Sequence, residues 1–124
     1  MDKPKILVVE DTPANMELVT DLLEIAGYEV IGVETAEEGV QIARTEKPSL
    51  IIMDIHLPGM DGLGATRILK EDPDTKGIPI IIATSSVMTG DEPLAWEAGC
   101  DGYVSKPIDT RAFPGIVAGF LNTE

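Results

Sequence analysis

Short runs of apolar residues recur along the chain, each bounded by polar or turn-forming residues. Three of them, at Lys5–Val9, Leu50–Met53 and Ile78–Ala83, are nearly continuous and rich in β-branched side chains. Runs of this length and composition are typical of strands that are buried on both faces of a sheet. Two less apolar segments, Tyr28–Val33 and Gly102–Ser105, are also predicted to be strands.

Between these segments, apolar residues recur at helical spacing. Thr12, followed by Pro13, and Thr35, followed three residues later by Glu38, have the pattern of helix N-caps. The final helix contains Pro114 and two glycines, so we expect it to kink, start late or fray. The predicted helices cover residues 13–26, 36–47, 63–71, 91–98 and 110–121.

Strand and helix therefore alternate five times, with short connections. This order predicts an α/β fold in which a five-stranded parallel sheet carries helices on both faces. We find no repeat, linker or low-complexity tract within the 124 residues. A chain of this length is expected to form one domain, residues 1–124.

Composition narrows the possible partners. Acidic residues outnumber basic ones 22 to 9, which gives a net charge of −13 and disfavours nucleic acid as a partner. No apolar run approaches the ~20 residues of a membrane span, and no apolar signal segment follows Met1. The single cysteine, Cys100, suits a reducing compartment. We therefore expect a soluble, cytoplasmic protein that does not bind membranes.

Polar side chains stand where four of the predicted strands end. They are Glu10 with Asp11, Asp54, Thr84 and Lys106. The carboxyl ends of parallel strands share one edge of the sheet, where α/β proteins bind ligands. Carboxylates that gather there need a cation, and Mg²⁺ prefers such oxygen ligands. A metal, a lysine and a hydroxyl are also what a transferring phosphoryl group needs, with Asp54 as the nucleophile.

In order and spacing, these residues make the chain similar to the receiver domains of two-component response regulators. The resemblance extends from about Lys5 to Leu121 and is greatest to stand-alone regulators without an output domain, among them the DivK-like kind. It implies a flavodoxin-like (βα)5 fold with strand order 2-1-3-4-5. The matching pieces are Glu10-Asp11, Asp54 with Pro58 and Gly62 behind it, Thr84, and Lys106-Pro107.

The resemblance also implies a role for each site residue. Asp54 accepts a phosphoryl group from a histidine kinase or a histidine phosphotransfer protein. Asp11, Asp54 and the main-chain carbonyl of His56 bind Mg²⁺, with Mn²⁺ as a substitute, and Glu10 acts through water.

Three further residues are expected to handle the phosphoryl group and pass on the signal. Lys106 holds a phosphoryl oxygen, while Thr84 and Tyr103 form the switch. The fourth helix, fifth strand and fifth helix then change their affinity for a downstream protein. Such a domain is a phosphoacceptor that assists its own phosphorylation and slow dephosphorylation, and is not an enzyme.

Two other functions fit the same general fold. An aspartate-based phosphatase or phosphotransferase would also place a nucleophile at Asp54, but haloacid-dehalogenase-like enzymes need a second aspartate where His56 stands. A flavin-binding carrier would need a phosphate-binding loop rich in Gly, Ser or Thr after the first strand. Glu10 and Asp11 occupy that place and would repel a phosphate.

Overall fold

A computed structural model describes residues 3–84, 91–106 and 108–121. Strands and helices alternate throughout, as the apolar pattern predicts. In chain order they are β1 (Lys5–Val9), α1 (Pro13–Ile25), β2 (Glu29–Val33), α2 (Ala36–Glu46), β3 (Leu50–Asp54), α3 (Gly62–Glu71), β4 (Ile80–Thr84), α4 (Asp91–Ala98), β5 (Gly102–Ser105) and α5 (Phe113–Leu121).

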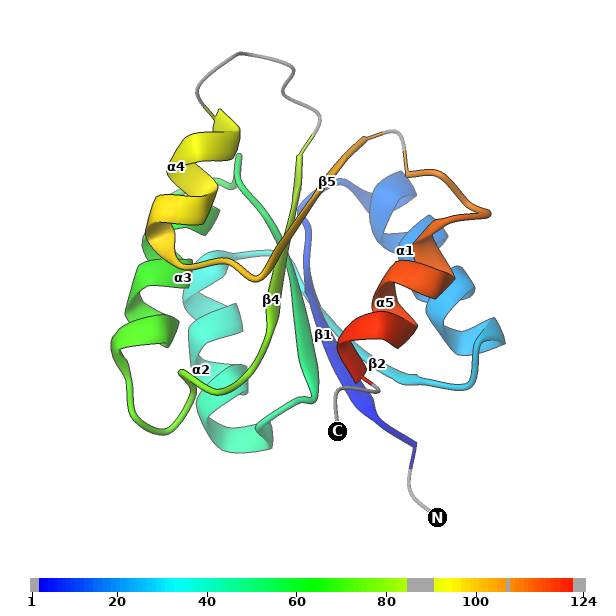
Figure 1. The fold of residues 1–124 in the computed structure, drawn as a ribbon, viewed down its shortest axis with the longest axis horizontal. Coiled ribbons are helices and arrows are strands. Elements are labelled where there is room, and N and C mark those ends of the chain that lie inside the picture. Colours follow the sequence, from blue (N-terminus) through cyan, green and yellow to red (C-terminus); the bar gives the residue numbers. More distant parts are fainter. Residues whose placement is uncertain (1–2, 85–90, 107, 122–124) are drawn as a thin grey trace.

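The strands form one parallel sheet in the order β2-β1-β3-β4-β5. Helices α2, α3 and α4 cover one face, and α1 and α5 cover the other (Figure 1). The predicted fold class and strand order are thus confirmed. Among the described helices, none has both the length and the apolar character needed to cross a membrane.

Alternate residues of the central strands divide between two hydrophobic cores. In β1, Leu7 and Val9 belong to the core beneath α2, α3 and α4, whereas Ile6 and Val8 belong to the core beneath α1 and α5. Successive strand side chains point to opposite faces of a sheet, so both sets must be apolar when both faces are covered. This explains why the inner strands read as continuous apolar runs.

Two helices end in the way that their glycines predict. At the end of α1, the N–H of Gly27 donates to the carbonyl of Glu24 and that of Tyr28 donates to Leu23, with Gly27 at φ 100°. The same pair of bonds follows α4, where Gly99 has φ 104°. Both are Schellman motifs, in which a left-handed residue stops the helix.

Other boundaries differ from the prediction by one to three residues. β2 begins at Glu29, because the N–H of Tyr28 is used in the Schellman motif. β4 begins at Ile80, because Pro79 has no N–H and Ile78 donates to Thr75 in a turn. It also runs one residue further than expected, to Thr84.

The sequence predicts that α5 starts at Thr110, but the helix begins at Phe113. The carboxylate of Asp109 accepts hydrogen bonds from the N–H groups of Arg111 and Ala112, at 3.0 and 3.2 Å, and holds them in a turn. Pro114 is consequently the second residue of the helix, where its missing N–H costs nothing. The expected late start is confirmed.

The two predicted N-caps have different outcomes. The Oγ1 of Thr35 accepts a hydrogen bond from the N–H of Glu38 at 3.2 Å, which confirms the cap of α2. Thr12 occupies the N-cap position of α1, but its side chain makes no capping hydrogen bond. Instead, the N–H of Thr12 donates to the Oε2 of Glu10 at 3.1 Å. The acid at the end of β1 therefore also fixes the entry to α1.

Candidate metal and phosphoryl site

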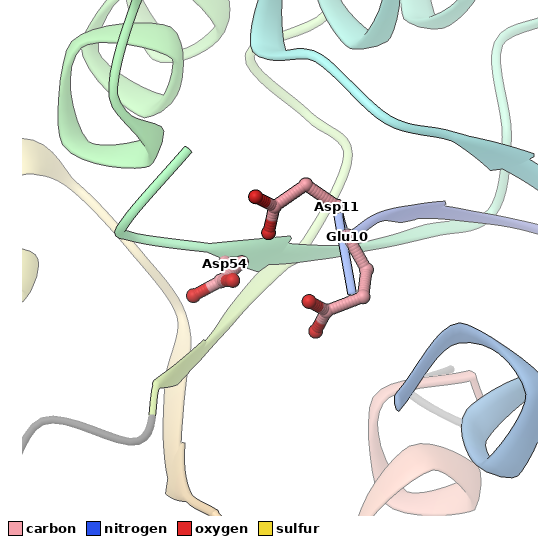
Figure 2. Close-up of side chains that lie close together, drawn as sticks. All are labelled: Glu10, Asp11 and Asp54. Atoms are coloured by element: carbon pink, nitrogen blue, oxygen red, sulfur yellow. The ribbon is translucent and has the colours of Figure 1, made fainter. Parts of the chain in front are cut away.

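The acids of the predicted site meet at the carboxyl edge of the sheet. Asp54 is the last residue of β3, and Glu10 and Asp11 follow β1 directly. β1 and β3 are neighbours with Val9 opposite Met53, so the next residues, Glu10 and Asp54, lie close together. One carboxylate oxygen from each of Glu10, Asp11 and Asp54 lies within 4.8 Å of the others (Figure 2).

Burial differs among the three acids. Glu10 and Asp54 are only 4% and 6% exposed, whereas Asp11 is exposed to solvent. Two of the three carboxylates are therefore shielded from water, and the cluster is open to solvent on the side of Asp11. Like charges 4–5 Å apart repel by about 3–4 kcal/mol at an effective dielectric of ~20. The three carboxylates are therefore most stable when a cation joins them.

Lys106 brings one positive charge into this cluster. It follows β5, and its N–H donates to the carbonyl of Thr84 at 2.8 Å. Its Nζ forms an ion pair with Glu10, and it lies 3.4 Å from Oδ2 of Asp54. The Lys106 side chain is 8% exposed, so the charge is largely withdrawn from water. One ammonium against three carboxylates leaves the cluster with a net negative charge.

The environment of Asp54 raises the pKa of its carboxyl above that of a free aspartate. Burial raises the pKa of this carboxyl above its ordinary value, and the neighbouring Glu10 raises it further. The Lys106 ammonium and the N–H of His56, which donates to Asp54 Oδ1 at 3.3 Å, oppose this rise. A cation at the cluster would act in the same direction as Lys106 and keep Asp54 ionised.

The donor set suits a hard divalent cation. Three carboxylates at the ends of two neighbouring strands converge on one point, and they exceed the positive charge that Lys106 supplies. Mg²⁺ prefers oxygen ligands of this kind and keeps several waters. The residues present therefore fit the metal that the sequence predicts.

Thr84 and Tyr103 also lie where the sequence places them along their strands. Thr84 is the last residue of β4 and is fully buried. Tyr103 lies on the adjacent strand β5, opposite Ile82, and packs half-buried against the core beneath α2, α3 and α4. His56 follows Asp54 by two residues, and Pro107 lies outside the described residues.

Two features of the site were not predicted. A Cβ atom added at Gly62 would lie 1.9 Å from the carbonyl oxygen of Asp54, so α3 begins directly against the end of β3. The Oε2 of Glu37, on α2, accepts a hydrogen bond from Met60 in the β3–α3 loop at 3.3 Å. Pro58 and Gly62 mark a turn in the sequence, but no local pattern indicates that Glu37 reaches it, 23 residues away.

Comparisons with known proteins agree with this arrangement. A family model described as the response regulator receiver domain matches residues 6–118. The chain is 40% identical over 116 residues to the polar-differentiation response regulator DivK of Brucella anthropi, an alignment that covers 94% of each chain. DivK of Brucella melitensis matches with the same identity and coverage.

Solved structures show the same fold. A putative response regulator from Chloroflexus aurantiacus has a TM-score of 0.92 and 29% identity, with 97% of this chain and 98% of that chain covered. The receiver domain of a sensor histidine kinase from Pseudomonas aeruginosa has a TM-score of 0.91 and 30% identity, over 98% and 99% of the two chains. That structure is described as holding a magnesium ion coordinated in the active site cleft.

Proposed function

Because the chain belongs to the response regulator receiver domain family, we propose that it is a phosphorylation-dependent signalling switch with Asp54 as its phosphoacceptor. The observation that carries this proposal is the position of Asp54. It ends the central strand β3 among two further carboxylates and the Lys106 ammonium. Receiver domains are in general switches and not enzymes.

The metal of this switch is Mg²⁺, for which Mn²⁺ can substitute. Asp11, Asp54 and the main-chain carbonyl of His56 would hold it directly, and Glu10 through water. When bound, the ion supplies the positive charge that neutralises the carboxylates and the phosphoryl oxygens. The convergence of three acids supports this assignment, as does the magnesium ion of the Pseudomonas aeruginosa receiver domain.

The phosphoryl donor is a histidine kinase or a histidine phosphotransfer protein. During transfer, the bond between phosphorus and the donor nitrogen breaks and a bond from a carboxylate oxygen of Asp54 to phosphorus forms. Asp54 must be ionised to attack, and the neighbouring Lys106 favours that form. Lys106 is also near enough to Asp54 to bind an oxygen of the attached phosphoryl group.

The response to phosphorylation passes through Thr84 and Tyr103. Thr84 moves to donate a hydrogen bond to the phosphoryl group, and Tyr103 turns into the space that this leaves. The surface of α4, β5 and α5 then changes its affinity for a downstream protein. Exposed apolar side chains on α4 and α5, namely Leu94, Trp96 and Ile116, support a protein partner at this surface.

Loss of the phosphoryl group is slow and assisted by the domain itself. His56 stands two residues after Asp54, where haloacid-dehalogenase-like phosphatases need a second aspartate as acid/base, and its presence there supports slow hydrolysis. We place the protein in the cytoplasm. Its one cysteine, Cys100, has a pKa raised to about 11, chiefly by burial, which keeps the thiol protonated.

The assignment of Asp54 can be tested by labelling. Incubation with acetyl phosphate and Mg²⁺ should add one phosphoryl group to the wild-type protein, detected by intact-protein mass spectrometry at neutral pH. Asp54→Asn should abolish the addition, because an amide oxygen is too weak a nucleophile. A label that persists in Asp54→Asn would refute the assignment.

A matched control is Asp61→Asn, in the same β3–α3 segment. Asp61 caps α3 by accepting the N–H of Gly64 at 2.7 Å, and asparagine can serve as the same cap. This variant should be labelled as the wild type is.

A further inference from the structure

The β3–α3 loop, residues 55–61, carries the carbonyl of His56 that the proposed metal site requires. Two hydrogen bonds within the segment shape it. The N–H of His56 donates to Asp54 Oδ1 at 3.3 Å, and that of Gly62 donates to the carbonyl of Ile55 at 2.9 Å. The first bond shapes the start of the loop, and the second brings its two ends close to each other.

Glu37 ties the tip of the loop to a different element. It is the second residue of α2, and its Oε2 accepts the N–H of Met60 at 3.3 Å. The preceding residue, Gly59, has φ 76°, and a Cβ atom there would lie 3.0 Å from the same oxygen. The carboxylate of Glu37 therefore lies against two consecutive residues of the loop.

The start of α2, which presents Glu37, is itself anchored on β1. Thr35 caps the helix, and Ala36 is fully buried. A Cβ atom at Gly39 would lie 2.8 Å from Cγ2 of Val9, so the helix packs closely on the last residue of β1. Val9 immediately precedes Glu10 and Asp11. The helix α2 packs on the end of β1, just before Glu10 and Asp11, and its residue Glu37 bonds to the loop that follows Asp54. Glu37 thus links the two parts of the chain that carry the three acids.

We propose that Glu37 is a positioning residue for the metal site. It holds the β3–α3 loop, and with it the His56 carbonyl, at a fixed position relative to the end of β1. This inference rests on the proposed function, because it assumes that the His56 carbonyl is a metal ligand. Mg²⁺ demands near-ideal octahedral geometry. A shift of the loop that displaces the His56 carbonyl therefore weakens binding even when every ligand is present. Glu37 itself does not touch the ion.

The test compares Mg²⁺ affinity in three variants by calorimetric titration. Glu37→Ala should bind Mg²⁺ about three- to tenfold more weakly than the wild type, the range expected for the loss of one exposed hydrogen bond. Glu37→Gln keeps an oxygen acceptor and should stay within about twofold of the wild type. In metal-free protein, amide hydrogen exchange at Met60 should be faster than in the wild type in Glu37→Ala, but not in the other two variants.

Glu38→Ala is the matched control. Glu38 carries the same charge in the same helical turn, but its contacts are with Thr35 in the cap of α2. Its removal should destabilise the helix without changing Mg²⁺ affinity. This variant therefore separates loop positioning from both charge and helix stability.

Three results would overturn the proposal. In the first, Glu37→Ala binds Mg²⁺ as the wild type does. In the second, all three variants are weakened equally, which would mean that Glu37 acts only through its charge or through helix stability. In the third, the wild-type protein binds no Mg²⁺, which overturns the proposed metal site and the role of Glu37 together. The first two results leave the proposed function intact.

Discussion

Both edges of the parallel sheet gather charged side chains, but they balance the charge differently. At the carboxyl edge, Lys106 faces three carboxylates, those of Glu10, Asp11 and Asp54. We call these four residues the carboxyl-edge cluster. It is the more deeply buried of the two ionic groups, with Lys106 8% and Glu10 4% exposed.

At the amino edge, one lysine meets one aspartate. Nζ of Lys70 lies 2.7 Å from Oδ2 of Asp101 and also donates to the carbonyl of Ile78 at 2.8 Å. The N–H of Ile80, which begins β4, donates to the same Asp101 oxygen at 2.9 Å. We call Lys70 and Asp101 the amino-edge pair.

The difference separates an ionic group whose charges are balanced within the fold from one whose excess of carboxylates fits an added cation. In the amino-edge pair, charges and main-chain donors are matched by the chain itself, so the pair is complete. In the carboxyl-edge cluster, burial and an excess of like charge oppose folding and favour an added cation. Removing a member should therefore destabilise the first group, while neutralising an acid of the second should relieve repulsion.

The largest effect is expected from Gly62→Ala, which breaks the carboxyl edge sterically. The new Cβ atom would lie 1.9 Å from the Asp54 carbonyl oxygen, so α3 or the end of β3 must shift. We expect a loss of about 3 kcal/mol of unfolding free energy in urea and reduced phosphorylation of Asp54.

The control for this variant is Gly64→Ala in the same helix. Its Cβ atom would meet Asp61 and Met60 at ordinary contact distances of 3.4 and 3.6 Å. Higher helix propensity should make Gly64→Ala slightly more stable than the wild type. If the two alanine variants were equally stable, the close approach of α3 to Asp54 would be wrong.

A smaller effect is expected from Asp101→Ala, which breaks the amino-edge pair. It leaves the N–H of the buried residue Ile80 without its acceptor, and Lys70 without its anion. We expect a loss of about 1–3 kcal/mol in urea unfolding. Asp101→Asn, which keeps an acceptor, should lose less.

Mg²⁺ affinity and acetyl phosphate labelling should remain at wild-type values in Asp101→Ala, since the amino-edge pair contributes nothing to the site. If Asp101→Ala changed Mg²⁺ affinity or labelling and left the unfolding free energy unaffected, the amino-edge pair would serve the site and not the fold, and the comparison would be wrong.

The smallest effect is expected from the charge of Asp54, measured with a chelator present. Because the folded-state pKa of Asp54 is raised, the folded protein holds this proton more tightly than the unfolded chain. The contribution of Asp54 to wild-type stability should therefore fall as pH rises from about 4, the ordinary value for an aspartate, through the raised pKa, and the cost then remains at neutral pH.

Asp54→Asn lacks this titration. It should be more stable than the wild type at pH 7, by less than Asp101→Ala is expected to lose, and the difference should shrink toward pH 4. Urea unfolding over this pH range measures it. A variant less stable than the wild type at pH 7 would show that the Lys106 ion pair outweighs burial.

Several properties of the fold were predictable because they depend on neighbours in the sequence. The nearly continuous apolar runs of β1, β3 and β4 identify strands buried on both faces. The glycines after α1 and α4 mark helix ends because they adopt positive φ there. The starts of β4 and α5 were less predictable. β4 starts late because Pro79 has no N–H and Ile78 donates to Thr75 in a turn. α5 starts late because the Asp109 carboxylate accepts from the N–H groups of Arg111 and Ala112.

Alternating strands and helices return every strand in the same direction, so the pattern of the chain was enough to place five site residues at one edge of the sheet: Glu10, Asp11, Asp54, Thr84 and Lys106. Which of these charges touch depends on how the strands and helices pack against one another. Lys106 pairs with Glu10, 96 residues away, as well as with Asp54, and Glu37 reaches the β3–α3 loop. The period of a strand or helix is a local property of the backbone, whereas contacts between side chains depend on the packing of elements that are distant in sequence.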